Sequence, residues 1–381
     1  MKIITGICRV AVGVLFIISG LIKANDPLGF SYKLAEYFEV FGIEFLKPFA
    51  LALAIFICAF EVGCGVATLT GSKIKLTSWA LMLMIVFFTF LTFYSAYFNK
   101  VTDCGCFGDA LHLTPWQSFS KDIVLFILIL PIFIRRNKIQ SFFSNKVDSI
   151  IAFGSVLLVA VFSIHCYRHL PIKDFRPYAI GKSIPEQMKI PDGAQPDVYE
   201  SVLVYKNKKT GEKKEFTTAE YMKATYLWQD TLTWAWESTE NKLVKEGYHP
   251  AIHDFSITSV EGEDVTQKII TNPTYNFLLI SYDIGLASKE IQPKINEFVG
   301  QCAKDSVAFI GLAGSSAKDI DNFRHDVNAL YDYYITDQTV LKTMIRSNPG
   351  LMLLKNGVVI NMWHYNDFPS YNEVASKYFK K

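Results

Sequence analysis

The sequence predicts an integral membrane α-helical bundle, made of four transmembrane helices plus a fifth, followed by an α/β soluble domain. Five apolar runs come close to or exceed the roughly 20 residues that a helix needs to cross a bilayer. They cover residues 3–21, 45–69, 76–98, 119–134 and 150–166. After residue 167 the chain reads as an ordinary soluble protein, although 50% of the whole chain is hydrophobic and only 19% is charged. We therefore expect a membrane bundle at 1–137, a fifth transmembrane helix at 146–167, a lead-in and accessory segment at 168–247, and a soluble domain at 248–381.

The first apolar run is expected to remain in the protein rather than to be cleaved as a signal peptide. Arg9 interrupts it, and Ser19-Gly20-Leu21-Ile22-Lys23 is a poor cleavage site. Cytoplasmic loops of membrane proteins are rich in lysine and arginine. Here these residues gather in the loops after the second and fourth helices, as Lys73, Lys75, Arg135, Arg136, Lys138 and Lys146. We expect a multi-pass protein in a bacterial inner (cytoplasmic) membrane, with its N-terminus in the cytoplasm and its soluble domain in the periplasm.

Residues 25–44, between the first two helices, predict a short amphipathic helix on the outer side of the bundle. Asp26 and Pro27 open it, and one face is lined by Phe30, Leu34, Tyr37, Phe38 and Phe41. Such a helix lies on the membrane surface or caps the bundle.

Two charged residues fall inside the predicted spans. Arg9 lies about two turns into the first helix, and Glu61 lies a little more than two turns from the cytoplasmic end of the second. Isolated charges are costly in hydrocarbon. The similar depths predict that Arg9 and Glu61 form an intramembrane ion pair. It would act as a structural clasp between two helices or, as the alternative, mark a proton or quinone site.

The segment Cys104-Gly105-Cys106 places two cysteines one residue apart at the mouth of the third helix, on the predicted outer side. A ring closed by two such cysteines is strained, and strained, exposed disulfides are the labile and catalytic ones. Gly105 supplies the backbone freedom that the ring needs. We therefore expect Cys104 and Cys106 to be redox-active. A permanent structural disulfide is the second interpretation. A metal clip with His112 and an aspartate is the third, but it falls short of the usual four ligands, so no metal is expected.

The soluble part predicts alternating strands and helices. We expect a hairpin from 202–205 and 215–217, then a helix or a helix plus a turn over 218–236. Farther on we expect a strand at 275–282, a helix at 287–302, a strand at 307–312, a helix at 319–330, and a hairpin of 351–354 with 358–362. Pro349, just before that hairpin, is the candidate for a cis peptide bond.

Two resemblances follow from these residues. Residues 1–137 resemble the DoxX/MauE membrane family through Arg9, the segment 19–23 with Asp26-Pro27, Glu61, and Cys104-Gly105-Cys106-Phe107-Gly108-Asp109. Residues 248–379 resemble the thioredoxin-like family, particularly its membrane-tethered TlpA-like branch. Where that family carries Cys-x-x-Cys, this chain reads Asp283-Ile284-Gly285-Leu286-Ala287-Ser288. The resemblance therefore implies a domain that cannot exchange disulfides by itself and instead docks the client protein.

The first hypothesis for function is a membrane thiol–disulfide redox protein. MauE-like proteins are associated with methylamine dehydrogenase maturation beside a thioredoxin-like partner, so the resemblance implies an extracytoplasmic thiol or thioredoxin-like client. Analogy with the bundle of vitamin K epoxide reductase implies a membrane quinone as acceptor. The alternative is a non-enzymatic membrane anchor or assembly subunit in which the two cysteines are structural. A transporter is disfavoured because no repeated half is visible. The net charge of +2 gives no nucleic-acid footprint.

Overall fold

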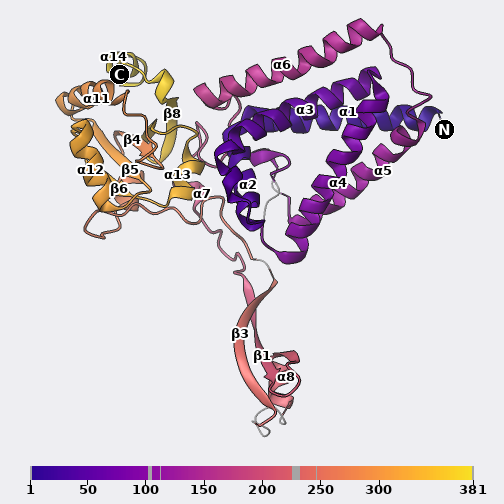
Figure 1. Ribbon diagram of the computed structural model, residues 1–381. Coiled ribbons are helices and arrows are strands. Elements are labelled where there is room, and N and C mark those ends of the chain that lie inside the picture. Colours follow the sequence, from indigo (N-terminus) through magenta and orange to yellow (C-terminus); the bar gives the residue numbers. More distant parts are fainter. Residues whose placement is uncertain (1, 102–104, 112, 225–231, 246, 380–381) are drawn as a thin grey trace. The chain divides into compact units, whose positions relative to one another are not determined.

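The computed structural model describes residues 2–101, 105–111, 113–224, 232–245 and 247–379 (Figure 1). The chain divides into two compact units, one made of Met1–Ile184 with Asp254–Lys381 and the other of Pro185–His253. The fifth long helix and the lead-in up to Ile184 thus belong with the first unit. Within that unit we call residues 2–169 the membrane half and residues 254–379 the thioredoxin-like domain.

Five helices within the described residues are long and apolar enough to cross a membrane, so the chain is a multi-pass membrane protein. They are built on α1 (Lys2–Asn25), α3 (Ala50–Thr70), α4 (Ile74–Phe98), α5 (Pro115–Arg135) and α6 (Asn145–His169). Large apolar side chains such as Phe56, Leu83 and Phe153 are exposed on them, as a lipid-facing surface requires. The prediction of five membrane helices is confirmed.

The expected amphipathic helix is present as α2 (Pro27–Val40) and caps the bundle. Asp26 is its N-cap, with the carboxylate accepting a hydrogen bond from Gly29 N, and Pro27 occupies the first turn. Phe30 and Leu34 are buried against the first turns of α3. Short 3₁₀ turns follow at η1 (Glu44–Phe49) and η2 (Gly108–Ala110).

The expected ion pair between Arg9 and Glu61 is wrong. Arg9 instead donates from Nε to the carbonyl of Thr68 (3.1 Å) and from Nη2 to that of Leu69 (3.0 Å). These carbonyls belong to the last turn of α3, where the helix leaves its acceptors unpaired. Glu61 pairs with Lys23 of α1. Arg9 therefore links α1 to α3 through backbone carbonyls and not through Glu61.

The packing register of α1 and α3 explains this difference. A Cβ added to Gly13 would lie 3.0 Å from the carbonyl of Gly65, and one added to Gly20 would lie 3.1 Å from that of Cys58. Small residues of this kind let membrane helices approach closely and fix their register. In this register Glu61 lies beside the C-terminal part of α1, while Arg9, near the start of α1, reaches only the C-terminal end of α3.

The thioredoxin-like domain is built on a five-stranded sheet of order β6-β5-β4-β7-β8 (Figure 1). Its strands are β4 (Tyr275–Ser281), β5 (Ala308–Ala313), β6 (Tyr333–Ile335), β7 (Gly350–Lys355) and β8 (Val358–His364). Strands β4, β5 and β6 are parallel, whereas β7 and β8 form an antiparallel hairpin added to β4. The helices are α10 (Thr266–Ile270), α11 (Gln292–Lys304), α12 (Ala317–Val327), α13 (Gln338–Met344) and α14 (Tyr371–Val374).

This strand–helix–strand–helix–hairpin order confirms the predicted fold class. The core is built on Phe277 and Leu279 of β4, packed against Ile295 and Phe298 of α11. The Asn348–Pro349 peptide bond is cis, at the position that the sequence indicates. Strand β6 and helix α13 were not predicted, and α11 begins later than expected, at Gln292.

The second unit holds a three-stranded antiparallel sheet of order β2-β1-β3. Its strands are β1 (Val198–Asn207), β2 (Lys213–Thr217) and β3 (Trp234–Lys245). The predicted hairpin is therefore confirmed. The helix expected over 218–236 is reduced to α8 (Thr218–Lys223), because residues from Trp234 onward pair with β1 instead; residues 225–231 lie outside the described part of the chain.

Candidate functional site

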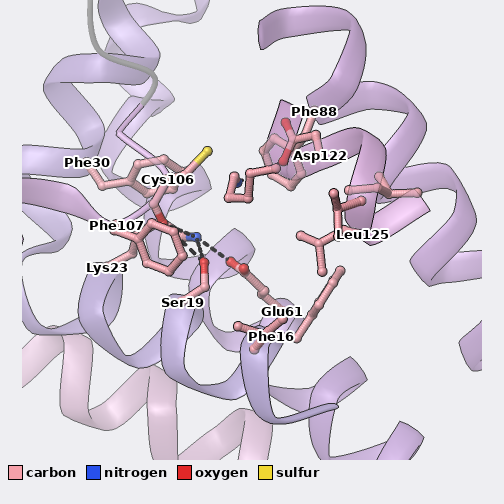
Figure 2. A pocket seen from close by; sticks show the side chains of 14 residues that line it. Phe16, Ser19, Lys23, Phe30, Glu61, Phe88, Cys106, Phe107, Asp122 and Leu125 are labelled. Atoms are coloured by element: carbon pink, nitrogen blue, oxygen red, sulfur yellow. Dashed lines mark hydrogen bonds and ion pairs between the residues drawn. The ribbon is translucent and has the colours of Figure 1, made fainter. Parts of the chain in front are cut away.

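A pocket lies where helices α1 to α5 meet the segment after α4 (Figure 2). Its cavity volume is about 220 Å³. The walls are mainly apolar and aromatic, and two groups of polar side chains interrupt them. The lining residues are Leu15, Phe16, Ser19, Lys23, Phe30, Glu61, Ile85, Phe88, Cys106, Phe107, Lys121, Asp122, Val124 and Leu125.

The first polar group is centred on Lys23 of α1. Its Nζ lies 2.7 Å from Glu61 Oε2, and the two side chains are only 4% and 7% exposed. The same ammonium donates to Ser19 Oγ (2.7 Å) and to the carbonyl of Cys106 (3.1 Å) (Figure 2). A buried ion pair is tolerated only when further hydrogen bonds satisfy its charges. Here Ser19 lies one helical turn before Lys23, so both residues face Glu61 and the Cys106 carbonyl.

The Cys106 loop, residues 105–111, passes along the edge of this pocket. Ser19 Oγ also donates to the carbonyl of Cys106 (3.1 Å), so two side chains of α1 hold this one peptide group. Gly105 has φ +67°, in the left-handed region that favours glycine. A Cβ there would lie 3.1 Å from Lys33 Cγ of α2. The backbone conformation therefore favours glycine between the two cysteines, and a larger residue would need the Lys33 side chain to shift.

Of the expected catalytic pair, the structure describes only Cys106. Cys104 lies outside the described residues, as does His112 of the alternative metal site. The pairing of Cys104 with Cys106 therefore stays a prediction. Among the described residues, no three histidine, cysteine, aspartate or glutamate side chains are grouped so as to hold a metal ion.

The second polar group lies on α5, on another wall of the pocket (Figure 2). Asp122 is 1% exposed. One of its oxygens lies 2.8 Å from Lys121 Nζ, and the other accepts a hydrogen bond of 3.0 Å from Thr92 of α4. Lys121 also lies 5.5 Å from the ring centre of Phe107 in the Cys106 loop. The pocket thus has two buried carboxylates, Glu61 and Asp122, each beside a lysine.

Sequence reasoning missed Lys23, Lys121 and Asp122. For Lys121 and Asp122 the available signal is their position inside the apolar run 119–134, since ionisable residues in membrane helices are candidates for function by default. Lys23 lies just beyond the first run and enters the sequence analysis only within the segment 19–23.

Comparison with known proteins assigns parts of the chain. Residues 1–135 match the family model described as "Methylamine utilisation protein MauE", and residues 199–246 match one described as "Domain of unknown function (DUF8463)". "Protein TlpB" of Flavobacterium psychrophilum is 24% identical over 135 residues, which cover 34% of this chain. The match spans only 36% of that relative's length.

Among solved structures, the "Solution structure of a putative protein disulfide isomerase from Bacteroides thetaiotaomicron" is similar to this chain. Its identity is 16% and its TM-score is 0.27, with 32% of this chain and 82% of that chain covered. The fold assignment of the soluble part rests on its own strand order and its cis-proline. The N-terminal region of this chain, residues 1–135, therefore matches the MauE family model, and it is followed by a domain with a thioredoxin-like fold.

Proposed function

We propose that this chain is a membrane-embedded thiol–disulfide redox protein that exchanges electrons between an extracytoplasmic thiol client and a membrane acceptor through Cys104 and Cys106. The observation that carries the proposal is the position of Cys106 at a pocket between the candidate membrane helices, which contains a buried lysine–glutamate pair. A thiol loop of purely structural use has no need of charges buried in hydrocarbon beside it. The MauE match and the thioredoxin-like fold support a redox role in general terms.

The exchange with the client balances as a thiol–disulfide reaction. A client dithiol reduces the Cys104–Cys106 disulfide, which becomes a dithiol while the client becomes a disulfide. The reverse reaction is the same chemistry run toward client reduction. To restore the starting state, two electrons and two protons must leave the cysteines for an acceptor in the membrane.

A membrane quinone is the acceptor class that the pocket fits. Aromatic walls from Phe30, Phe88 and Phe107 suit a flat ring. The ammonium of Lys23 would donate to a carbonyl oxygen of that ring by exchanging one of its present hydrogen bonds, to Ser19 or to the Cys106 carbonyl. A quinone would supply a two-electron, two-proton sink. Glu61 and Asp122 are the buried carboxylates positioned to exchange protons at this pocket. The cavity of about 220 Å³ would hold the ring of such a molecule and leave its tail in lipid.

The proposed topology puts the Cys106 loop, α2 and the thioredoxin-like domain on the periplasmic side of a bacterial inner membrane. The basic residues in the loops after the second and fourth spans support this orientation. Disulfides persist in that compartment.

The alternative function is a non-enzymatic anchor or assembly subunit. It is favoured by one observation, since the turn Asp283–Ser288 after β4 contains no cysteine and cannot carry redox chemistry. Under this alternative, Cys104 and Cys106 stay permanently oxidised.

The test is the thiol state of Cys104 and Cys106 in intact cells, read after acid quenching and alkylation with a bulky maleimide. The Cys104→Ser and Cys106→Ser variants serve to trap a mixed disulfide with the client, and Cys302→Ser, at a buried site in the thioredoxin-like domain, is the matched control. We expect a mixture of reduced and oxidised forms and a trapped client in one serine variant. A fully oxidised pair that traps nothing would favour the anchor.

A further inference from the structure

Arg346 is a buried arginine of the thioredoxin-like domain whose partners lie in the membrane half. It follows α13 and precedes the cis-proline Pro349 by three residues. Although it belongs to a soluble domain, it is only 5% exposed. A buried charge needs partners that repay its desolvation.

Two carboxylates of the membrane half supply these partners. Arg346 Nε lies 3.0 and 2.8 Å from the two oxygens of Asp26, and Nη2 lies 2.9 Å from Asp109 Oδ2. The remaining nitrogen, Nη1, donates to the carbonyl of Lys342 in its own domain. Asp26 is the N-cap of α2, and Asp109 lies in the Cys106 loop, three residues after the cysteine. One guanidinium therefore joins α2 to the Cys106 loop.

Aromatic packing surrounds this contact. Tyr32 of α2 meets Tyr282 edge to face, with ring centres 6.4 Å apart, and the Arg346 guanidinium lies 5.7 Å from the Tyr32 ring centre. Tyr282 precedes the turn at Asp283, whose carbonyl accepts a hydrogen bond of 2.7 Å from Asn348. The face formed by this turn and the cis-proline segment is therefore covered by α2 of the same chain.

The charge of Arg346 and the space around its guanidinium both suit the contact with Asp26 and Asp109. Burial alone would lower the pKa of Arg346, but Asp26 and Asp109 outweigh it and raise this pKa, so the guanidinium stays charged. Arginine suits the position because its planar fork serves several carboxylate oxygens at once. A Cβ added to Gly29 would lie 2.7 Å from Arg346 Nη2, so the first turn of α2 leaves no room for a side chain there.

We propose that Arg346 is a positioning residue through which the thioredoxin-like domain docks on its own chain, by way of Asp26 and Asp109, and fixes the conformation and accessibility of the Cys106 loop. The occupant of the cis-proline face is thus a segment of this protein and not a separate client. The docking itself does not depend on the proposed function; only a redox role for the loop that it fixes rests on that function.

The experiment compares Arg346→Gln and Asp109→Asn with the wild type, as full-length protein in lipid nanodiscs. Arg324→Gln is the matched control, because Arg324 pairs with Asp332 at 3.3 Å on the exposed surface of the same domain. Two quantities are measured: the rate at which a maleimide labels reduced Cys106, and amide hydrogen exchange over α2 and the Cys106 loop. We expect both to rise severalfold in Arg346→Gln, to rise less in Asp109→Asn, which keeps the Asp26 contact, and to stay unchanged in Arg324→Gln.

The two readouts separate the possible failures. If Arg346→Gln keeps β4 and β7 protected from exchange, so that its domain is folded, yet changes neither quantity, the inference is wrong. If Arg346→Gln unfolds the domain, Asp109→Asn decides the question, because it removes only the contact to the loop. If exchange responds as expected but Cys104 and Cys106 never change oxidation state in cells, the docking stands and the proposed redox function fails.

Discussion

The Cys106 loop is held by two basic residues, one from each half of the first unit, and the two contacts differ in kind. Lys23 of the membrane half binds the Cys106 carbonyl while it pairs with Glu61, and it borders a cavity. Arg346 of the thioredoxin-like domain binds Asp109 while it pairs with Asp26, and its nitrogens are occupied by carboxylates and a carbonyl. Lysine is a compact point charge, whereas arginine is a rigid fork. Under the proposed function, Lys23 takes part in the chemistry of the pocket that it borders, whereas Arg346 only holds the loop in place.

The largest effect is expected where one member of the buried membrane pair is removed. Glu61→Ala leaves Lys23 as an uncompensated charge in an apolar bundle, which typically costs about 3–5 kcal/mol of stability. The double variant Lys23→Met with Glu61→Leu removes both charges, so its stability should return close to that of the wild type. Reversible unfolding in mixed micelles would measure both variants.

The same double variant tests the chemical role of the pair. We expect it to be folded but unable to pass electrons from Cys104 and Cys106 to a quinone analogue. If the double variant transfers electrons as fast as the wild type, Lys23 and Glu61 have no part in the chemistry. Lys23 would then only hold the Cys106 loop in place, as Arg346 does.

The fold was predictable from the sequence because its signals are local, whereas the site depends on distant contacts. The apolar runs, the Asn356-Gly357 turn with both residues at positive φ, and the proline before β7 each act within a few residues. The pairing of Lys23 with Glu61 requires the register of two helices, which glycine contacts set. The pairing of Arg346 with Asp26 spans 320 residues, and no periodicity carries such information.

A further prediction concerns the pH response of the thioredoxin-like domain. His364, at the end of β8, is 3% exposed, and burial lowers its pKa to about 4, against an opposing effect of Asp367 and a smaller lowering by His169 and Arg168. Since this folded-state pKa lies below the ordinary value of about 6.5, the unfolded chain binds the proton first as the pH falls. Stability contributed by neutral His364 is therefore complete above about pH 6.5 and lost toward pH 4, with roughly 2 kcal/mol lost at pH 5.

Amide exchange over β7 and β8, corrected for intrinsic rates, would measure this loss between pH 7.5 and pH 5. His364→Gln should flatten the pH dependence, since it removes the titrating ring. If β8 loses protection equally in that variant, another group carries the response.

A smaller effect is expected at two glycines with similar backbone strain. An alanine at Gly105 (φ +67°) or at Gly357 (φ +75°) must adopt the left-handed conformation, at a cost of roughly 1–2 kcal/mol. Both variants should lose stability, and Gly105→Ala should lose slightly more because its Cβ would also lie 3.1 Å from Lys33 Cγ. Only Gly105→Ala should change the maleimide labelling rate of Cys106, because Gly357 lies in the β7–β8 turn. An equal change in labelling from Gly357→Ala would mean that the loop responds to general destabilisation.

The smallest effect is expected at an exposed ion pair of α2. Lys33 and Glu36 lie 3.1 Å apart, close to the 2.7 Å of Lys23 and Glu61, but their side chains are 31% and 40% exposed. Water and salt screen such a pair, so Glu36→Gln should cost less than about 0.5 kcal/mol, and the cost should vanish at high ionic strength. Unfolding of Glu36→Gln and Glu61→Ala in the same micelles would compare the two pairs directly. If Glu36→Gln and Glu61→Ala cost similar amounts of stability, groups other than Glu61 must stabilise the charge of Lys23. The buried pair would then differ little in energy from the exposed one.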